Sequence, residues 1–242
     1  MSYIYNNFIY IPLYNGLMSL SDLLPFLDAG VIIILFTIVV KLVLFPISKK
    51  AVRTQAMMKL VEPELNAIKE KYKNDKQAQA LRVMNFYKAK QINPFSSIFL
   101  LFIQLPIIFA LYKIFYTGFS PIDTSILYSF VAAPESINVF FLSLLDVTSK
   151  SWIMAFLAAV SQYFQIRYSM PVLPPKKESP SFSDDFARNM QIQMKYVLPV
   201  MIFFISSQVA AALAIYWTTS NLFMIGQEIV VRRQLAKEGL KK

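Results

Sequence analysis

Residues 29–46 read AGVIIILFTIVVKLVLFP, a nearly continuous run of apolar side chains that carries one charge, Lys41. As a helix, a run of this length crosses the hydrocarbon core of a bilayer, which is about 30 Å thick. A lysine inside such a span costs about 2.5–3.5 kcal/mol, and it usually faces water, a partner or a functional cavity. In the alternative interpretation, its four-carbon stem carries the ammonium group to the cytosolic interface. The position of Lys41 alone leaves both interpretations open.

The whole chain has the composition of a membrane protein. Hydrophobic residues make up 56% and charged residues 16% of the 242 positions, which is more apolar material than a soluble core of this size encloses. The net charge of +10 is expected to gather on the cytoplasmic side, near anionic headgroups. The chain contains no cysteine and no histidine, so thiolate and imidazole chemistry are excluded. We therefore expect no enzyme activity, no metal site and no cofactor.

Apolar runs along the chain predict an all-α membrane protein with five transmembrane helices. A membrane-spanning helix needs roughly 20 apolar residues. The predicted spans are Asp28–Ile47, Asn93–Thr117, Ser151–Met170, a shorter run around Tyr196–Ser207, and Ala211–Val231 after a polar turn. The predicted parts are an amphipathic, interfacial segment (1–27), a five-span core (28–233) that contains a cytosolic helical hairpin (48–92), and a basic cytosolic tail (234–242).

The basic residues predict that the N-terminus lies outside the cell and the C-terminus inside. No lysine or arginine precedes Lys41, whereas basic residues are dense between positions 49 and 90. The loop 118–150 is acidic, and the tail after Val231 is basic again. Because lysine and arginine collect in the cytoplasmic loops of membrane proteins, these segments agree on an N-out, C-in orientation.

Residues 48–92 are the only long polar segment, and they have the pattern of a helical hairpin. Apolar residues recur every three or four positions before and after a break at residues 73–75. Met57, Met58 and Met84 belong to this apolar set, and methionine-rich surfaces adapt to partners of varied sequence. Packing of the two helices on each other is the plainer use of the same residues.

Several segments together carry a resemblance to a known family. They are KLVLFPISK (41–49), QAMMKL (55–60), YKAKQINP (87–94), IQLPIIFALY (103–112) and AIYWTTSNL (214–222). In this order they resemble the YidC/Oxa/Alb family of membrane protein insertases, over roughly residues 30–233. The resemblance implies a polar groove that is open to the cytosol and to lipid, with a positive residue in the first core span. That residue is usually arginine in the bacterial family, and Lys41 stands here.

The resemblance also implies what the groove does, and its lining is predicted from matching positions and from depth in the spans. A protein of this family moves short polar tails of client proteins through the groove and releases their hydrophobic segments into the bilayer. Candidate groove residues, besides Lys41, are Gln104, Gln162, Gln165, Tyr216, Trp217, Ser220 and Asn221, and Met57, Met58 and Met84 are candidates for client contact. For the glutamines, hydrogen bonding that merely holds the helices together is the alternative. For Tyr216 and Trp217, the alternative is an interfacial aromatic belt.

The expected partners are nascent membrane protein clients and membrane lipids, in a bacterial plasma (inner) membrane. A ribosome and a Sec-type translocon are further candidates, and DNA is not expected. A small polytopic transporter or channel with an intramembrane lysine is the alternative function. Such folds tend to show repeated halves, and the sequence contains no internal repeat. The hairpin between the first two spans also favours an insertase, since a transporter has no evident use for it.

Overall fold

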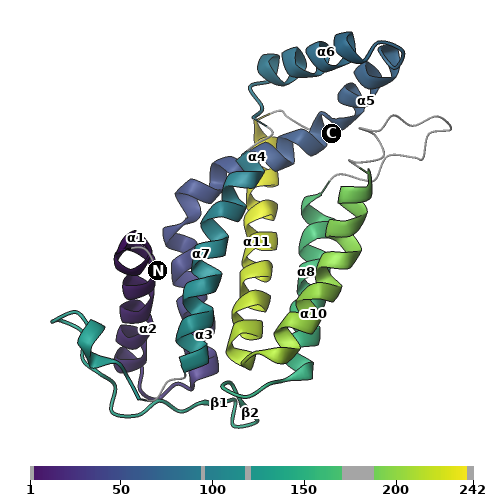
Figure 1. Ribbon diagram of the computed structural model, residues 1–242. Helices are drawn as coiled ribbons and strands as arrows, with labels where there is room; N and C mark the ends of the chain where they lie inside the picture. Colours follow the sequence, from purple (N-terminus) through teal and green to yellow (C-terminus); the bar gives the residue numbers. More distant parts are fainter. Residues whose placement is uncertain (1–2, 94–95, 118–120, 171–187, 239–242) are drawn as a thin grey trace.

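The computed structural model describes residues 3–93, 96–117, 121–170 and 188–238, without the side chains of residues 96–103. Most of the described chain is helical, and its long helices stand side by side (Figure 1). The elements are α1 (Tyr3–Tyr5), η1 (Asn6–Tyr10), α2 (Ile11–Leu23), α3 (Ala29–Val43), α4 (Phe45–Leu60), α5 (Glu62–Lys71), α6 (Lys76–Ala89), α7 (Ser96–Thr117), η2 (Thr124–Ile126), β1 (Phe140–Phe141), β2 (Leu145–Asp146), α8 (Trp152–Ser169), η3 (Gln193–Val197), α10 (Leu198–Gln208) and α11 (Ala211–Lys237).

One helical stretch of the described chain, Arg188–Gln208, is by itself long and apolar enough to cross a membrane. Helices α3 and α4 pass the same test only as a pair, and they bend by 75° at the break between them. The predicted first span, Asp28–Ile47, is therefore wrong as a single straight helix. Pro46 explains the break, because it has no N–H to bond the carbonyl of Leu42 and its ring crowds the preceding turn. Lys41 consequently lies in the last turn of α3.

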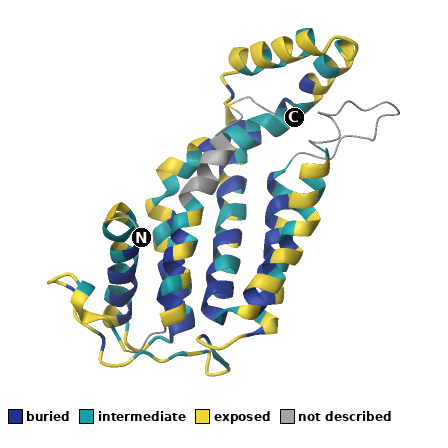
Figure 2. Ribbon diagram, viewed as in Figure 1, coloured by how far each residue is buried: buried dark blue, intermediate teal, exposed yellow. Residues whose placement is uncertain are grey.

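Helix α11 is central to the bundle. It packs against α8, α3, α4 and α7, while α10 packs mainly against α8 (Figure 1). The largest core cluster joins α2, α3, α7 and α11 through residues such as Leu17, Ile33, Leu111 and Tyr216. Buried positions face the interior of the bundle in Figure 2, whereas α10 exposes Phe204 and other large apolar side chains. Exposed apolar surface of this extent is what a bilayer covers.

The N-terminal segment packs lengthwise on the bundle. Helix α2 contacts α3 and α7, and η1 contacts α7. Tyr10, Tyr14, Leu17 and Met18 are buried in the largest core cluster, so this segment shares its core with the helices that follow. Asn15 ties the segment to the loop after α7, because its side chain accepts from the backbone N–H of Tyr128 at 2.7 Å.

The loop after α7 closes one end of the bundle and contains the one departure from an all-α fold within the described chain. Strands β1 and β2 pair antiparallel, with Phe140 opposite Asp146. Asp28 links this hairpin to α3, since its carboxylate accepts from the backbone N–H groups of Val31 (2.8 Å) and Leu142 (2.9 Å). The first bond caps the N-terminus of α3. Strands of two residues are too short for a period-2 pattern to be read from sequence.

The polar segment lies at the opposite end of the bundle (Figure 1). Helix α4 leaves the bundle, and α5 and α6 pack on each other beyond it. The predicted break at residues 73–75 is confirmed, because α5 ends at Lys71 and α6 begins at Lys76, with Asp75 as its N-cap. The helix predicted before this break is two helices, since Pro63 starts a new helix after Val61.

The contact between Gly30 and Phe141 gives a stability prediction. A Cβ atom at Gly30 would lie 2.2 Å from Cδ2 of Phe141, so Gly30→Ala forces the ring to move. We expect it to lower the free energy of unfolding by about 1–3 kcal/mol. Gly226→Ala is the matched control, because within the described chain its added Cβ meets nothing within 4 Å apart from chain neighbours and its own helix backbone. Removing the helical glycine should stabilise by about 0.5–1 kcal/mol. If both substitutions change the free energy of unfolding equally in denaturant unfolding, the close contact between Gly30 and Phe141 is contradicted.

A buried polar chain as the candidate functional site

Three helices bring Lys41, Gln104 and Tyr216 into one hydrogen-bonded group. The Nζ of Lys41 on α3 donates to Oε1 of Gln104 on α7 at 2.9 Å. The Nε2 of Gln104 then donates to the hydroxyl of Tyr216 on α11 at 2.5 Å. Lys41 is 9% exposed and Tyr216 is 2% exposed, while Gln104 is half-buried. Ser220, one turn further along α11, is also buried.

The charge of Lys41 is only partly compensated. Within the described chain, no carboxylate forms an ion pair with its ammonium group, and its hydrogen bond is to a neutral amide. The C-terminal end of α3 offers some compensation, because the partial negative charge of a helix C-terminus favours a cation. A desolvated ammonium with a neutral partner retains its attraction for an additional negative group.

A second polar chain connects α8 with α11. Trp217 donates from Nε1 to Oε1 of Gln162 at 3.1 Å, and Gln162 donates to Gln165 at 3.2 Å. Gln165 continues to Ser169 at 3.2 Å. Asn221 makes a separate link, since its Nδ2 donates to Oγ of Ser161 at 3.0 Å. These side chains are buried except Trp217, which is half-buried.

A buried carboxylate ends the second chain. Ser169 hydrogen-bonds to Glu228, which is 1% exposed. Arg232 donates to the same carboxylate from Nε at 2.9 Å and from Nη2, and Nη2 also donates to the carbonyl of Tyr168 at 2.7 Å. Lys59 of α4 donates to that carbonyl at 3.0 Å, so α4, α8 and α11 meet here.

The structure thus separates the predicted groove residues into two groups. Lys41, Gln104 and Tyr216 lie together, whereas the bonds of Trp217 to Gln162 and of Asn221 to Ser161 hold α8 to α11. Gln162 makes an interhelical hydrogen bond to Trp217, whereas Gln165 bonds Gln162 and Ser169 on its own helix. Pro106 lies inside α7, and the helix continues through it from Ser96 to Thr117.

The predicted client-contact methionines do not share one surface. Met57 packs on the cluster of Val52, Val231 and Leu235, between α4 and α11. Met58 is half-buried, and Met84 on α6 is 51% exposed. Met84 is therefore the most exposed of the three, and Met57 packs against α11 rather than on the second helix of the hairpin.

Sequence reasoning missed Ser169, Glu228 and Arg232. Their spacing in the sequence could have revealed them. Gln162, Gln165 and Ser169 follow one another at intervals of three and four positions on α8. Glu228 and Arg232 are likewise one turn apart on α11. Residues at these spacings share a helix face, and a polar face inside an apolar bundle must find partners.

Comparison with known proteins places the chain in a family. The family described as "60Kd inner membrane protein" matches residues 20–238. The membrane protein insertase YidC of Clostridium tetani is 34% identical over 220 residues, which cover 90% of this chain and 88% of that protein. The chain belongs to the YidC insertase family. The YidC of Fusobacterium nucleatum is 30% identical over 97% of this chain and 99% of its own length. The resemblance drawn from the quoted segments is therefore confirmed.

Another YidC protein shows how family members differ in size. The YidC of Francisella tularensis subsp. novicida is 28% identical over 204 residues, which are 84% of this chain but only 32% of that protein. The shared part includes most of the helical bundle described here. Membership of the YidC family makes this chain a membrane protein insertase of the bacterial inner membrane.

Proposed function

We propose that this YidC-family insertase moves short polar tails of nascent membrane proteins past Lys41 and releases their apolar segments into lipid. The observation that carries the proposal is the bond between Lys41 and Gln104, which holds a cation among membrane helices with an uncharged partner. A negatively charged tail would supply the negative charge that the partner of Lys41 lacks. Gln104 on α7 and Tyr216 and Ser220 on α11 would offer it further hydrogen bonds.

The proposed topology has five spans with the N-terminus outside and the C-terminus inside. Helices α3, α7, α8, α10 and α11 run side by side, which supports this count (Figure 1). The basic hairpin α5–α6 lies at one end of the bundle and the acidic loop after α7 at the other. The three proposed parts are the amphipathic, interfacial segment 1–27, the five-span core 28–233 and the basic tail 234–242. Within the first part, α2 packs against α3 and α7.

The physical basis of the mechanism is solvation. A client segment inserts only when its polar tail crosses hydrocarbon, and that crossing is the main barrier. A water-filled groove that reaches Lys41 would shorten the distance that the tail crosses through hydrocarbon, and the lysine would attract acidic residues of the tail. Burial of the apolar segment in lipid then drives the process forward. The exposed apolar side of α10, around Phe204, is a suitable exit surface.

The hairpin is proposed as the first contact of the client on the cytosolic side. Leu81 and Met84 expose apolar surface on α6, within a basic segment. A ribosome and a Sec-type translocon are proposed as further partners at this end. The plasma membrane, crossed five times, is the proposed location.

Thiol labelling distinguishes this function from a transporter or channel. The chain has no cysteine, so a single Gln104→Cys substitution reports one position. We expect a membrane-impermeant thiol reagent to label it from the cytosolic side only. Leu105→Cys is the matched control at the same depth, because this side chain is exposed on the bundle surface and lipid would suppress its reaction. Labelling of position 104 from both sides would indicate a channel or transporter.

A further inference from the structure

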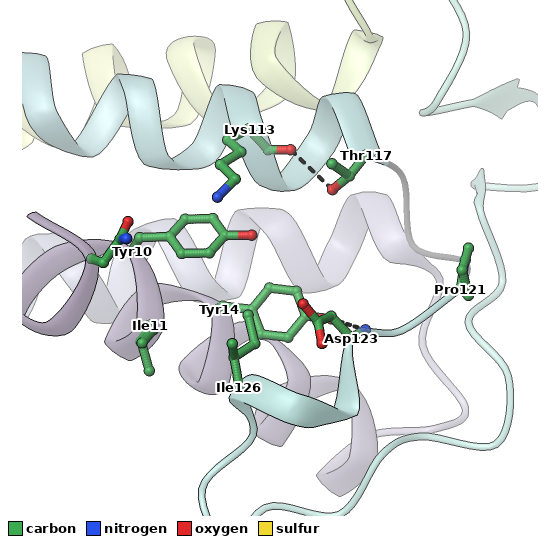
Figure 3. Close-up of a pocket in the computed structure, with 9 residues that line it drawn as sticks. Tyr10, Ile11, Tyr14, Lys113, Thr117, Pro121, Asp123 and Ile126 are labelled. Carbon is green, nitrogen blue, oxygen red and sulfur yellow. Dashed lines mark hydrogen bonds between the residues drawn. The ribbon is translucent and has the colours of Figure 1, made fainter. Parts of the chain in front are cut away.

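A cavity of about 270 Å³ lies beside the last turns of α7 (Figure 3). This end of α7 is opposite the hairpin (Figure 1). Its walls come from η1, the start of α2, the last turns of α7 and the loop 121–126. The volume is slightly below the range of about 300–1,000 Å³ for sites that enclose whole small molecules. It therefore suits one polar group of a larger ligand. The polar residues that line it are Asn6, Tyr10, Tyr14, Lys113, Thr117 and Asp123.

Lys113 gives the cavity a positive charge. Its Nζ lies 3.9 Å from the centroid of the Tyr10 ring, and within the described chain it forms no ion pair. A ring face neutralises an ammonium group only partly. In the proposed orientation this lysine lies near the outer leaflet, where lysines are uncommon in membrane proteins. An acceptor bearing negative charge would complete its surroundings.

Asp123 gives the cavity a negative charge on another wall. One carboxylate oxygen, Oδ1, accepts from the backbone N–H (3.1 Å) and hydroxyl (2.5 Å) of Ser125. The backbone N–H of Asp123 donates to the Tyr14 hydroxyl at 2.8 Å, which fixes the loop against α2 and leaves the hydroxyl hydrogen to donate (Figure 3). The side-chain oxygen of Asn6 is buried and, within the described chain, has no hydrogen-bond partner.

We infer that this cavity binds a phosphoethanolamine group. Its phosphate would accept from Lys113 and from the Tyr14 hydroxyl, and its ammonium would donate to Asp123 and to the Asn6 oxygen. The positive charge of Lys113 and the negative charge of Asp123 sum to zero, so a zwitterion matches the cavity better than an anion does. The acceptors also require N–H donors, which a primary ammonium has and the quaternary ammonium of choline lacks.

The source of this group is a membrane phospholipid. The neighbouring side chains Phe8 and Tyr116 are 74% and 77% exposed, and they would contact acyl chains. A bound headgroup would join segment 1–27 to the end of α7, two parts that meet through η1 and α2. The inference uses the proposed orientation but not the groove, so it stands independently of the role of Lys41.

The test is lipid binding to the purified full-length protein in a mild detergent. Short-chain phosphatidylethanolamine, phosphatidylcholine and phosphatidylglycerol are titrated, with soluble O-phosphoethanolamine as a separate arm. Bound lipid is counted by native mass spectrometry, and the thermal midpoint is followed in parallel. We expect phosphatidylethanolamine to bind at least tenfold more tightly than the other two lipids. If O-phosphoethanolamine binds as tightly as phosphatidylethanolamine, the cavity still binds a phosphoethanolamine group. Its natural ligand is then a soluble compound and not a lipid.

Variants separate binding from folding. Lys113→Gln should weaken phosphatidylethanolamine binding at least tenfold, and Lys113→Arg should retain it. Asp123→Asn keeps an oxygen for Ser125 and should bring the affinities for phosphatidylethanolamine and phosphatidylcholine close together. Lys150→Ala is the control, because Lys150 lies on the same loop but contacts Gln208. Equal binding of all three lipids, or unchanged binding by Lys113→Gln, would overturn the inference, and preference for phosphatidylglycerol would show an anion site instead.

Discussion

Substitution of Lys41 by glutamine is expected to lower the insertion of clients with acidic tails by about 10- to 30-fold. Two opposite charges about 8 Å apart attract by about 2 kcal/mol at an effective dielectric constant near 20, and about 1.4 kcal/mol corresponds to tenfold. Glutamine keeps a hydrogen-bond donor for Gln104, so the substitution removes mainly the charge. The measurement is the yield of protease-protected client in proteoliposomes that contain each variant.

Client charge provides the control for Lys41. A client whose tail has asparagine and glutamine in place of its acidic residues should insert almost equally well with wild-type protein and with Lys41→Gln. Lys41→Arg should retain insertion of both clients, because a guanidinium keeps the charge. Wild-type insertion of the acidic-tailed client by Lys41→Gln would remove electrostatic attraction from the mechanism. A groove that acts through hydration alone would then be the remaining explanation.

The largest expected loss of stability comes from Glu228→Leu. This substitution leaves Arg232 and Ser169 without their carboxylate at the junction of α8 and α11. Removing one partner of a buried ion pair costs about 3–5 kcal/mol. Because Arg232 is 31% exposed and water solvates part of its charge, we expect about 2–3 kcal/mol here. Denaturant unfolding in detergent micelles, followed by tryptophan fluorescence, measures the difference.

Glu238→Gln is the matched control for Glu228. Glu238 also pairs with an arginine, because Arg53 donates to its carboxylate from Nη1 at 3.0 Å and from Nη2 at 2.5 Å. That hydrogen bonding lowers the pKa of the Glu238 carboxyl, but the side chains of Arg53 and Glu238 are 40% and 46% exposed. Exposed pairs contribute little to stability. Comparable losses from Glu228→Leu and Glu238→Gln would contradict the special role of the buried pair.

Hydropathy predicted the helices well because each apolar run needs a neighbour or lipid to cover it. It failed at residues 44–46, where apolar composition continues but Pro46 prevents the helix from doing so. Composition averages over a window, whereas the bend depends on one missing N–H group. The 75° bend places Lys41 at the end of a helix, which a continuous span would not do.

The candidate site was predictable in its residue types but not in its pairing. Lys41 and Gln104 attracted notice because each is polar within an apolar run, yet their bond joins positions 63 residues apart in the sequence. Trp217 and Tyr216 are neighbours in sequence but belong to different polar groups, because successive residues of a helix point in different directions. Glu228 escaped notice because it lies near the basic end of its helix, where a charge is unremarkable.

Lysine at position 41 has consequences for client recognition. An ammonium group is a compact charge with rotatable donors, whereas a guanidinium presents a planar fork that holds a carboxylate in two bonds. One N–H group of the Lys41 ammonium already donates to Gln104. We therefore interpret its attraction for an acidic tail as electrostatic and weakly oriented, which suits clients of varied sequence.

Reconstitution of the purified protein tests the central claim most directly. Liposomes containing only this protein are supplied with a single-span client that has a short acidic tail, made by translation without other membrane components. The account predicts that the tail becomes protected from external protease in these liposomes and stays accessible in protein-free liposomes of the same lipids. Equal protection in both would contradict the claim that this chain carries the tail across the membrane.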